Sequence, residues 1–502
     1  MHSSSTSRKP VLSSALKRSS TDSHPKSKAK SPLYEKTIPS AGLLGSHSKT
    51  NGVEQTSVTM STTTRDAGKG ALLALFLVTM IDMIGFGIII PFLTYLVQDL
   101  AAEQGVVQVG LWVGLLMTAY SSAQFISSPF WGSLSDRIGR RRVLMIGLVG
   151  NTVFFTAFGL SNTLLFALSM RFFAGIFNGN IAVARAYIGD VSTPKQLATR
   201  MGLIGAAFGL GFTIGPFIGG EFSSPAERWD LFVGTIFETY PYLLPCLIAS
   251  ILSAGSLVLA YFKLPESIDL ERAREDEHLS WGRQMSMIAS NSVSMLRTAT
   301  IGAMIWVSML FMLGFTVMHS VFILYTEMDP ANGGLGFSEQ DNGRMFAMIG
   351  LLGIFTQATL IGPLTRKFGT RRLIPLSIIL TGIGLVMIPY TQTNLVWLQM
   401  LLVLSCIAIG NGVFQPSSST YLTRLARDTD YDLGAVMGAQ ESLSAFARIL
   451  GPLSGGLAWE LTVNGSYPWD YHTPFHLCGL LMLISGLLTL RLPVMPELDE
   501  AE

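Results

Sequence analysis

Charged side chains are scarce in this 502-residue sequence: Asp, Glu, Lys and Arg make up 13% of it, against 49% hydrophobic residues. A soluble domain usually carries about 25% charged residues. Cysteine is scarcer still, and Cys246, Cys406 and Cys478 all fall inside apolar stretches. The shortage of charge argues against a soluble domain, and the cysteines have the spacing of neither a disulfide framework nor a thiolate metal site.

Long apolar runs are abundant instead. From residue 71 onward twelve of them have about 20 residues, the length with which an α-helix crosses a bilayer core roughly 30 Å thick. They cover residues 71–98, 111–131, 143–160, 163–189, 199–220, 241–262, 299–325, 344–364, 373–391, 394–420, 433–458 and 473–492. Helices satisfy their own backbone inside lipid, whereas barrel strands would alternate polar and apolar residues. We therefore predict an all-α multi-pass membrane protein with twelve transmembrane helices.

The loop after the second run is repeated later in the chain. Residues 132–142 read Gly-Ser-Leu-Ser-Asp-Arg-Ile-Gly-Arg-Arg-Arg, and residues 362–372, after the eighth run, read Gly-Pro-Leu-Thr-Arg-Lys-Phe-Gly-Thr-Arg-Arg. The two copies align without a gap. The sequence therefore predicts a duplication that gives two bundles of six helices each.

Basic residues lie mostly on one side of the predicted membrane region. The loops on the side of the amino terminus contain many Lys and Arg residues, whereas Arg228 is the only basic residue in the opposite loops. Because Lys and Arg collect in cytoplasmic loops, both termini should be cytoplasmic. The net charge of +1 hides this segregation and gives no support for a nucleic-acid partner.

Polar segments surround and divide the apolar region. The first 70 residues are rich in Ser and in basic residues and have no apolar period, which predicts a disordered cytosolic tail; an acid-poor leader of this kind is also typical of an organellar transit peptide. The predicted organisation is a tail at 1–70, a six-helix bundle at 71–263, a partly helical cytoplasmic linker at 264–298, a second six-helix bundle at 299–492 and a short tail at 493–502.

The repeated loop contains residues suited to a gate. Gly132 and Gly139 allow close backbone approach, and Asp136 can cap a helix amino terminus and pair with guanidinium groups. Because such ion pairs can form and break as two bundles rock, we predict that the loop latches one conformation; charge that only sets the topology is the alternative. The gating set is Gly132, Asp136, Arg137, Gly139, Arg140 and Arg141, supported by Arg185 and Asp190.

A stripe of small residues adds to this gate in the fifth run. Gly211, Gly215 and Gly219 are four apart and so nearly on one helix face, which permits close packing of helices. Pro216 adds a kink. The eleventh run repeats the pattern as Gly-Pro-Leu-Ser-Gly-Gly at 451–456. We expect both helices at the interface between the bundles, where bending changes access; ordinary small-residue packing is the alternative.

These motifs resemble the major facilitator superfamily, and within it the drug:proton antiporters of the tetracycline-resistance type, including the tetracycline-transporter-like proteins of animals. The resemblance covers residues 71–492 and implies that the bundles alternate access to a solute site between them. The histidine that tetracycline exporters carry in helix 8 falls near Gly353, which argues against tetracycline as the substrate. The resemblance rests on Asp-Met-Ile-Gly-Phe-Gly-Ile-Ile-Ile-Pro at 82–91, Gln124, the loop at 132–142, Arg-Phe-Phe-Ala-Gly at 171–175, and the run at 211–220, which looks like the family's antiporter motif.

Ionisable residues inside apolar runs are costly and are therefore functional candidates. Asp82 is the leading proton-coupling residue, because a carboxylate between two bundles can exchange a proton as its surroundings change; a structural ion pair with Arg171 is the alternative. Glu441 and His319 are further proton-coupling candidates, although a lone histidine on an apolar helix is more often a packing residue. Glu441 and Arg448 lie two turns apart on one face, too far for a direct bridge but suited to line one cavity.

Matching polar pairs indicate a solute site. Asn178 with Gly179, and Asn411 with Gly412, occupy equivalent places in the fourth and tenth runs, where an amide beside glycine can face a midplane cavity. Transporters built from repeats bind solute at the interface of their halves. The candidate substrate-binding residues are Gln124, Arg171, Asn178, Phe315, Gln357, Asn411, Gln415 and Arg448.

Together these features predict a secondary active transporter that exports an amphipathic organic solute or drug in exchange for protons. Proton-coupled uptake of an organic anion is one alternative, since Arg171, Arg185 and Arg448 could hold a carboxylate. A non-transporting membrane receptor on the same fold is another. The sequence has no nucleophile–base pair, phosphate loop or metal cluster, so we expect no enzyme, cofactor or metal site. We expect a monomer in the plasma membrane or a vacuolar or endosomal membrane.

Overall fold

The computed structural model describes residues 69–268, 281–391, 394–429 and 433–493, and every regular element in these ranges is a helix. The predicted all-α class is therefore confirmed. Most of the predicted amino-terminal tail, the middle of the predicted linker and nearly all of the predicted carboxyl-terminal tail lie outside the described residues.

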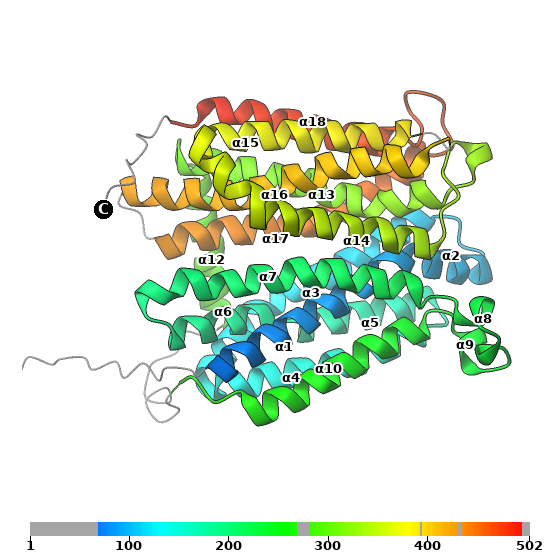
Figure 1. Cartoon of the computed structure of the whole chain (residues 1–502), viewed down its shortest axis with the longest axis horizontal. Helices are drawn as coiled ribbons and strands as arrows, with labels where there is room; N and C mark the ends of the chain where they lie inside the picture. The colour runs from blue at the N-terminus through cyan, green and yellow to red at the C-terminus, as the bar shows by residue number, and fades with distance from the viewer. Residues whose placement is uncertain (1–68, 269–280, 392–393, 430–432, 494–502) are drawn as a thin grey trace, which may run out of the picture. The chain divides into compact units, whose positions relative to one another are not determined.

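Short connections join the helices of each half. The first half contains α1 (Lys69–Ile88), α2 (Leu93–Gln104), α3 (Val109–Ile138), α4 (Arg140–Gly159), α5 (Leu164–Phe177), α6 (Asn180–Val191), α7 (Pro194–Glu221), the one-turn helices α8 (Pro225–Arg228) and α9 (Ile236–Thr239), and α10 (Leu243–Lys263). After α12 (Trp281–Leu296), the second half contains α13 (Ile301–Glu327), α14 (Glu339–Phe355), α15 (Ile361–Met387), α16 (Val396–Asp428), α17 (Leu433–Thr462) and α18 (Thr473–Leu488). Figure 1 shows the two sets of helices side by side.

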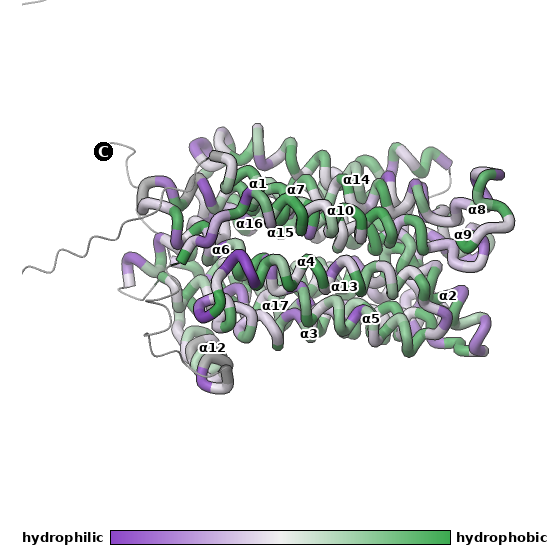
Figure 2. The backbone as a smooth tube through the Cα atoms, turned by 90° about the horizontal axis from the view of Figure 1, so that it is seen from below, coloured by the Kyte–Doolittle hydropathy of each residue, from purple (hydrophilic) through white to green (hydrophobic). Residues whose placement is uncertain are grey.

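Ten helical segments among the described residues are long and apolar enough to span a membrane. One of them, Glu339–Tyr390, has 52 residues and contains two of the predicted runs, between which Gly369 has a positive φ of 70°. α17 is not among the ten, although it covers the eleventh predicted run. Figure 2 shows apolar residues along the helices and polar residues gathered toward their ends. The chain is an integral membrane protein.

The fourth predicted run forms two helices instead of one. α5 and α6 are separated by Asn178 and Gly179, and the backbone leaves helical geometry at Asn178, whose ψ is 51°. A break inside a membrane span leaves carbonyl groups without helical partners. Here Trp131 of α3 donates its indole N–H to the carbonyl of Ile176, and Gln124 donates to the carbonyl of Asn178 at 3.0 Å. α3 therefore stabilises the break.

The glycines of α7 face two different helices. A Cβ on Gly219 would overlap the carbonyl oxygen of Ile88, so the predicted stripe packs against α1 of its own half. Another face of α7 reaches the second half, because a Cβ on Gly220 would lie 2.5 Å from the carbonyl oxygen of Glu339 in α14. α7 thus lies at the interface between the halves, as expected, but the stripe itself does not face the other half.

α17 repeats this arrangement in the second half. A Cβ on Gly455 would overlap the Ser320 hydroxyl of α13 in the same half. One on the neighbouring Gly456 would overlap the carbonyl oxygen of Gly110 of α3 in the first half. Both small-residue helices therefore use one glycine face within their half and a second across the interface.

Most of the described hydrogen bonds that join the halves lie at the end of the molecule near α8, which we call the α8 end. The Tyr95 hydroxyl donates to the carbonyl of Phe337 at 2.7 Å and accepts from Asn342 at 2.9 Å. Arg344 Nε lies 2.7 Å from Glu221 Oε1. α1 begins and α18 ends at the opposite end (Figure 1). The described contacts thus hold the halves together at the α8 end.

Candidate functional site

Asp82 of α1 is completely buried in the first half, with 0% of its surface exposed. Its Oδ1 accepts a hydrogen bond from Asn151 Nδ2 of α4 at 2.6 Å. Its Oδ2 has no partner among the described residues, and the Asn180 amide lies beside the carboxylate without a hydrogen bond of ordinary geometry. A carboxylate in such surroundings is costly to keep charged.

Tyr120 of α3 brings several predicted residues together. Asn178 donates its amide N–H to the Tyr120 hydroxyl, and the Arg171 guanidinium carbon lies 4.5 Å from the centre of the Tyr120 ring. Gln124 is linked to the same group through its hydrogen bond to the Asn178 carbonyl. Asp82 is close enough to act electrostatically on Tyr120. Four predicted site residues thus surround one tyrosine.

Arg171 does not pair with Asp82. Its guanidinium group lies over the rings of Tyr120 and, at 5.8 Å, Phe158, and the aromatic faces stabilise its charge. Its Nε and Nη1 have no hydrogen-bond partner among the described residues. The alternative in which Asp82 and Arg171 form a helix clamp is therefore wrong for this structure.

Glu441 and Arg448 form the direct ion pair that their spacing was expected to prevent. Arg448 Nη2 lies 3.0 Å from Glu441 Oε1. Seven residues separate the two backbones by roughly 10 Å along the helix, but both side chains are long and arginine leans toward the helix amino terminus. Arg185 of α6, in the other half, is close enough to act electrostatically on Glu441. Charged side chains of both halves are therefore within electrostatic range of one another here.

The aromatic candidates of the second half lie in a separate cluster on α13. Phe315 stacks on Phe311 at 6.4 Å and meets the edge of His319 at 4.7 Å between ring centres. Phe346 lies on the other side of His319 at 6.0 Å. This aromatic surrounding favours a packing role for His319, and its proton-coupling role stays a prediction.

The three amide candidates of the second half have different surroundings. Gln415 and Gln357 are exposed, and Gln357 lies in the π-helical turn Thr356–Leu360, a feature that is frequent at functional sites. Asn411 has a buried amide oxygen without a partner among the described residues. α16 continues through Asn411 without a break, unlike the equivalent place in the first half.

Arg140 is the centre of the predicted gate. Its Nη1 lies 2.6 Å from Asp136 Oδ1, and its Nε lies 3.1 Å from Asp190 Oδ2. The Ser267 hydroxyl also donates to Asp190 Oδ2 at 2.9 Å. These described contacts tie α3, α4 and α6 to the segment after α10, so they stabilise the first half itself and do not bridge the two halves.

Glu266 takes the capping role that was expected of Asp136. Asp136 lies in the last turn of α3, whereas Glu266 Oε1 accepts the backbone N–H groups of Arg140 at 2.7 Å and Arg141 at 3.4 Å, the first residues of α4. A carboxylate at this place complements the helix dipole. Gly139 has a φ of 106°, and a Cβ on it would overlap the Glu266 carboxylate. Glycine is therefore required at 139.

Other predicted gating residues make fewer contacts. A Cβ on Gly132 would have nothing within 4 Å, so the expected close approach at Gly132 is wrong. Arg137 and Arg185 are exposed. Arg141 donates to the carbonyl of Tyr261 and lies 5.5 Å from the centre of its ring.

Sequence reasoning missed four residues that shape these sites. Tyr120, Asn151 and Asn180 are polar groups inside apolar runs, and this property could have identified them. Glu266 lies in the predicted linker among other polar residues, so the sequence contains no signal that separates it from solvent-exposed acids.

Two sets of membrane-spanning helices that bury ionisable groups such as Asp82 and Arg171 are typical of one class of protein, the membrane transporters. The chain belongs to the Major Facilitator Superfamily, because the model of that family matches residues 75–452 and, in an overlapping match, 310–501.

Curated relatives confirm the resemblance to transporters of the tetracycline-resistance type. A probable peptide/nitrate transporter of Arabidopsis thaliana is 28% identical over 401 residues, which cover 77% of this chain and 82% of that protein. The class C tetracycline resistance protein of Escherichia coli is 27% identical over 387 residues, which cover 76% of this chain and 88% of the relative. These relatives are transporters and not enzymes.

Solved structures show the same fold. A human organic anion transporter matches with a TM-score of 0.59 and 22% identity, over 84% of this chain and 99% of that one. A D-xylose–proton symporter matches with a TM-score of 0.62 and 16% identity, over 84% and 98%.

Proposed function

We propose that the protein exports an amphipathic organic solute in exchange for protons, and that it has twelve transmembrane helices with both termini in the cytoplasm. Membership of a transporter family supports the proposal that the protein moves a solute. Relatives named for tetracycline and multidrug resistance support export as the direction. The proposed location is the plasma membrane or a vacuolar or endosomal membrane, and the proposed state is a monomer in lipid.

The buried carboxylate of Asp82 is the observation that carries the coupling proposal. Its nearest polar neighbours, Asn151 and Asn180, are neutral amides, and Arg171 is directed to aromatic rings instead. Charge on Asp82 is unfavourable while water is excluded and becomes acceptable when the site is wetted. A change in access would therefore load and release a proton. Glu441 and His319 are secondary candidates for the same role.

Alternating access is supported by the one-sided distribution of contacts between the halves. In the proposed orientation the α8 end faces away from the cytoplasm, so the hydrogen bonds of Tyr95 and the ion pair of Arg344 with Glu221 close the outer side. The opposite state requires these contacts to break while each half keeps its internal packing.

The charges of Glu441, Arg448 and Arg185 are the proposed contact for the polar part of the solute, because they come from both halves. The remaining substrate-binding residues, Gln124, Arg171, Asn178, Phe315, Gln357, Asn411 and Gln415, are proposed to line its path. Uptake of an organic anion is the second candidate, since two arginines against one glutamate leave net positive charge at this contact.

The test is proton movement in sealed proteoliposomes with an imposed pH gradient, followed by a fluorescent pH indicator while organic cations and anions are added. We expect solute-dependent collapse of the gradient with wild type and with Glu103→Gln, an exposed carboxylate of the same half, but not with Asp82→Asn. The class of solute that collapses the gradient decides between export of an amphipathic solute and uptake of an organic anion. Collapse that persists in Asp82→Asn would contradict the coupling role, and solute movement without protons would contradict antiport.

A further inference from the structure

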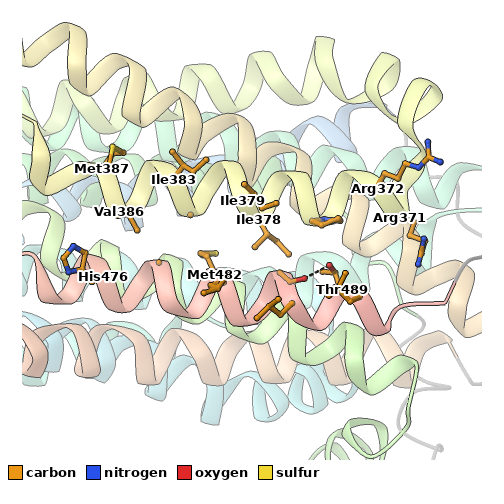
Figure 3. Close-up of a pocket in the computed structure, with 17 residues that line it drawn as sticks. Arg371, Arg372, Ile378, Ile379, Ile383, Val386, Met387, His476, Met482 and Thr489 are labelled. Carbon is orange, nitrogen blue, oxygen red and sulfur yellow. Dashed lines mark hydrogen bonds between the residues drawn. The ribbon is translucent and has the colours of Figure 1, made fainter.

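A long groove lies between α15 and α18 of the second half (Figure 3). Its volume is about 760 Å³. Most of its wall is apolar, and the exposed fractions of Ile379, Ile383 and Leu483 are all above half. Arg371 and Arg372 lie together at one end of the groove (Figure 3).

The groove is long enough to hold a lipid chain, which spans one leaflet, about half of the bilayer core. The lining residues on α15 run from Arg371 to Met387, which corresponds to roughly 24 Å at 1.5 Å per residue, most of a bilayer core of roughly 30 Å. Glycines bring the two helices together along it, since a Cβ on Gly382 would lie 3.1 Å from Met482 and one on Gly479 would overlap Val386. A long apolar groove of this kind fits an extended hydrocarbon chain better than a compact solute.

The two arginines keep uncompensated charge. The first copy of the loop contains an acidic residue, Asp136, but the second copy has Arg366 in its place, so the second loop has no acidic residue of its own. Arg371 donates to the carbonyl of Leu492 at 3.1 and 3.3 Å, and within the described ranges neither arginine has an acidic partner. The second copy thus places free positive charge at a membrane boundary.

We propose that this groove binds an anionic phospholipid, with one acyl chain along α15 and α18 and the phosphate on Arg371 and Arg372. Basic pockets between transmembrane helices on the cytoplasmic side are suited to anionic headgroups. The proposal uses the orientation proposed above to assign the leaflet, and it does not depend on the transported solute or on proton coupling. The groove lies on the lipid-facing surface of the second half, away from Asp82 and its neighbours in the first half.

Native mass spectrometry of the full-length protein in detergent tests the proposal, with phosphatidylglycerol and phosphatidylcholine of identical acyl chains as probes. Each arginine near an anionic headgroup contributes about five-fold in affinity, so Arg371→Gln with Arg372→Gln should weaken phosphatidylglycerol binding roughly 30-fold. The matched control is Arg424→Gln with Arg427→Gln, which removes the same charge from the end of α16 outside the groove. Ile383→Trp fills the groove without changing charge and should also weaken binding.

A photoactivatable phosphatidylglycerol locates the site directly, with crosslinks expected on peptides that contain residues 371–387 or 476–490. Equal retention of the two lipids, or an equal loss of binding in the control pair, would overturn the proposal. Lipid binding that appears only after residues 494–502 are removed would also overturn the proposal, because the acidic tail would then occupy the groove. Dimerisation that Ile383→Trp abolishes would assign the groove to a second copy of the chain. Transport assays play no part in these outcomes, so failure here leaves the proposed solute export and proton coupling untouched.

Discussion

Replacement of Gly220 by alanine should open the α8 end of the molecule. A Cβ on Gly220 would lie 2.5 Å from the carbonyl oxygen of Glu339 and 2.9 Å from the Cα of Gly343, across the interface between the halves. Both neighbours are backbone atoms, so no side chain can rotate away. The methyl group must separate α7 from α14, and it has this effect only in the conformation in which the two halves touch at this end.

The magnitude follows from the cost of overpacking, about 1–3 kcal/mol for an added group in a well-packed contact. Because about 1.4 kcal/mol is a factor of ten, the ratio of the open to the closed conformation should rise roughly 5- to 150-fold. Alanine also stabilises a helix by about 1 kcal/mol relative to glycine. That gain cancels in the ratio, because α7 is helical in both conformations.

Double electron–electron resonance measures the effect, with spin labels at two exposed residues, Glu227 in α8 of the first half and Asp329 in the loop after α13 of the second. Gly205→Ala is the matched control, since it lies on the same helix and its Cβ would meet nothing within 4 Å. We expect a population at longer distance in Gly220→Ala alone. If folded Gly220→Ala gives the distances of wild type and of the control, backbone contact at Gly220 does not hold the α8 end closed.

Two further predictions concern Glu266 and Glu441. Glu266→Ala leaves the first N–H groups of α4 without their acceptor, so the free energy of unfolding should fall by about 1–3 kcal/mol in thermal denaturation, against little change for the exposed Glu103→Ala. Glu441→Gln breaks a pair whose side chains are 54% and 36% exposed, so unfolding should change by less than about 1 kcal/mol while solute transport falls at least tenfold. Unchanged stability in the first variant, or intact transport in the second, would contradict these roles.

Apolar length and the repeated loop were sufficient to predict the helical membrane fold. Lipid permits few alternatives to a helix, so composition alone constrains the class. Composition could not reveal the break at Asn178 and Gly179, because its freed carbonyls are satisfied by Trp131 and Gln124 from a distant part of the chain. Long-range partners of this kind have no local sequence signal.

The candidate site was predicted in part. Asp82, Arg171, Gln124 and Asn178 meet around Tyr120, as buried polar residues in a membrane must find one another. The separation of Glu441 and Arg448 was misjudged because spacing describes the backbone, whereas the reach of long side chains decides contact. The capping role was assigned to Asp136 because local spacing hides Glu266, which arrives from the segment after α10.

The unequal behaviour of Asn178 and Asn411 limits how far the duplication can be used in reasoning about this chain. The two residues occupy equivalent places in the fourth and tenth predicted runs, yet the first follows the end of a helix and the second lies within one continuous helix. The fourth span therefore has a break at which α5 and α6 can change their angle, whereas α16 has no break at Asn411 and has a proline, Pro416, inside it instead. A mutation at one of these two asparagines is then no guide to the same mutation at the other, because the duplication has kept the residue and changed the backbone around it.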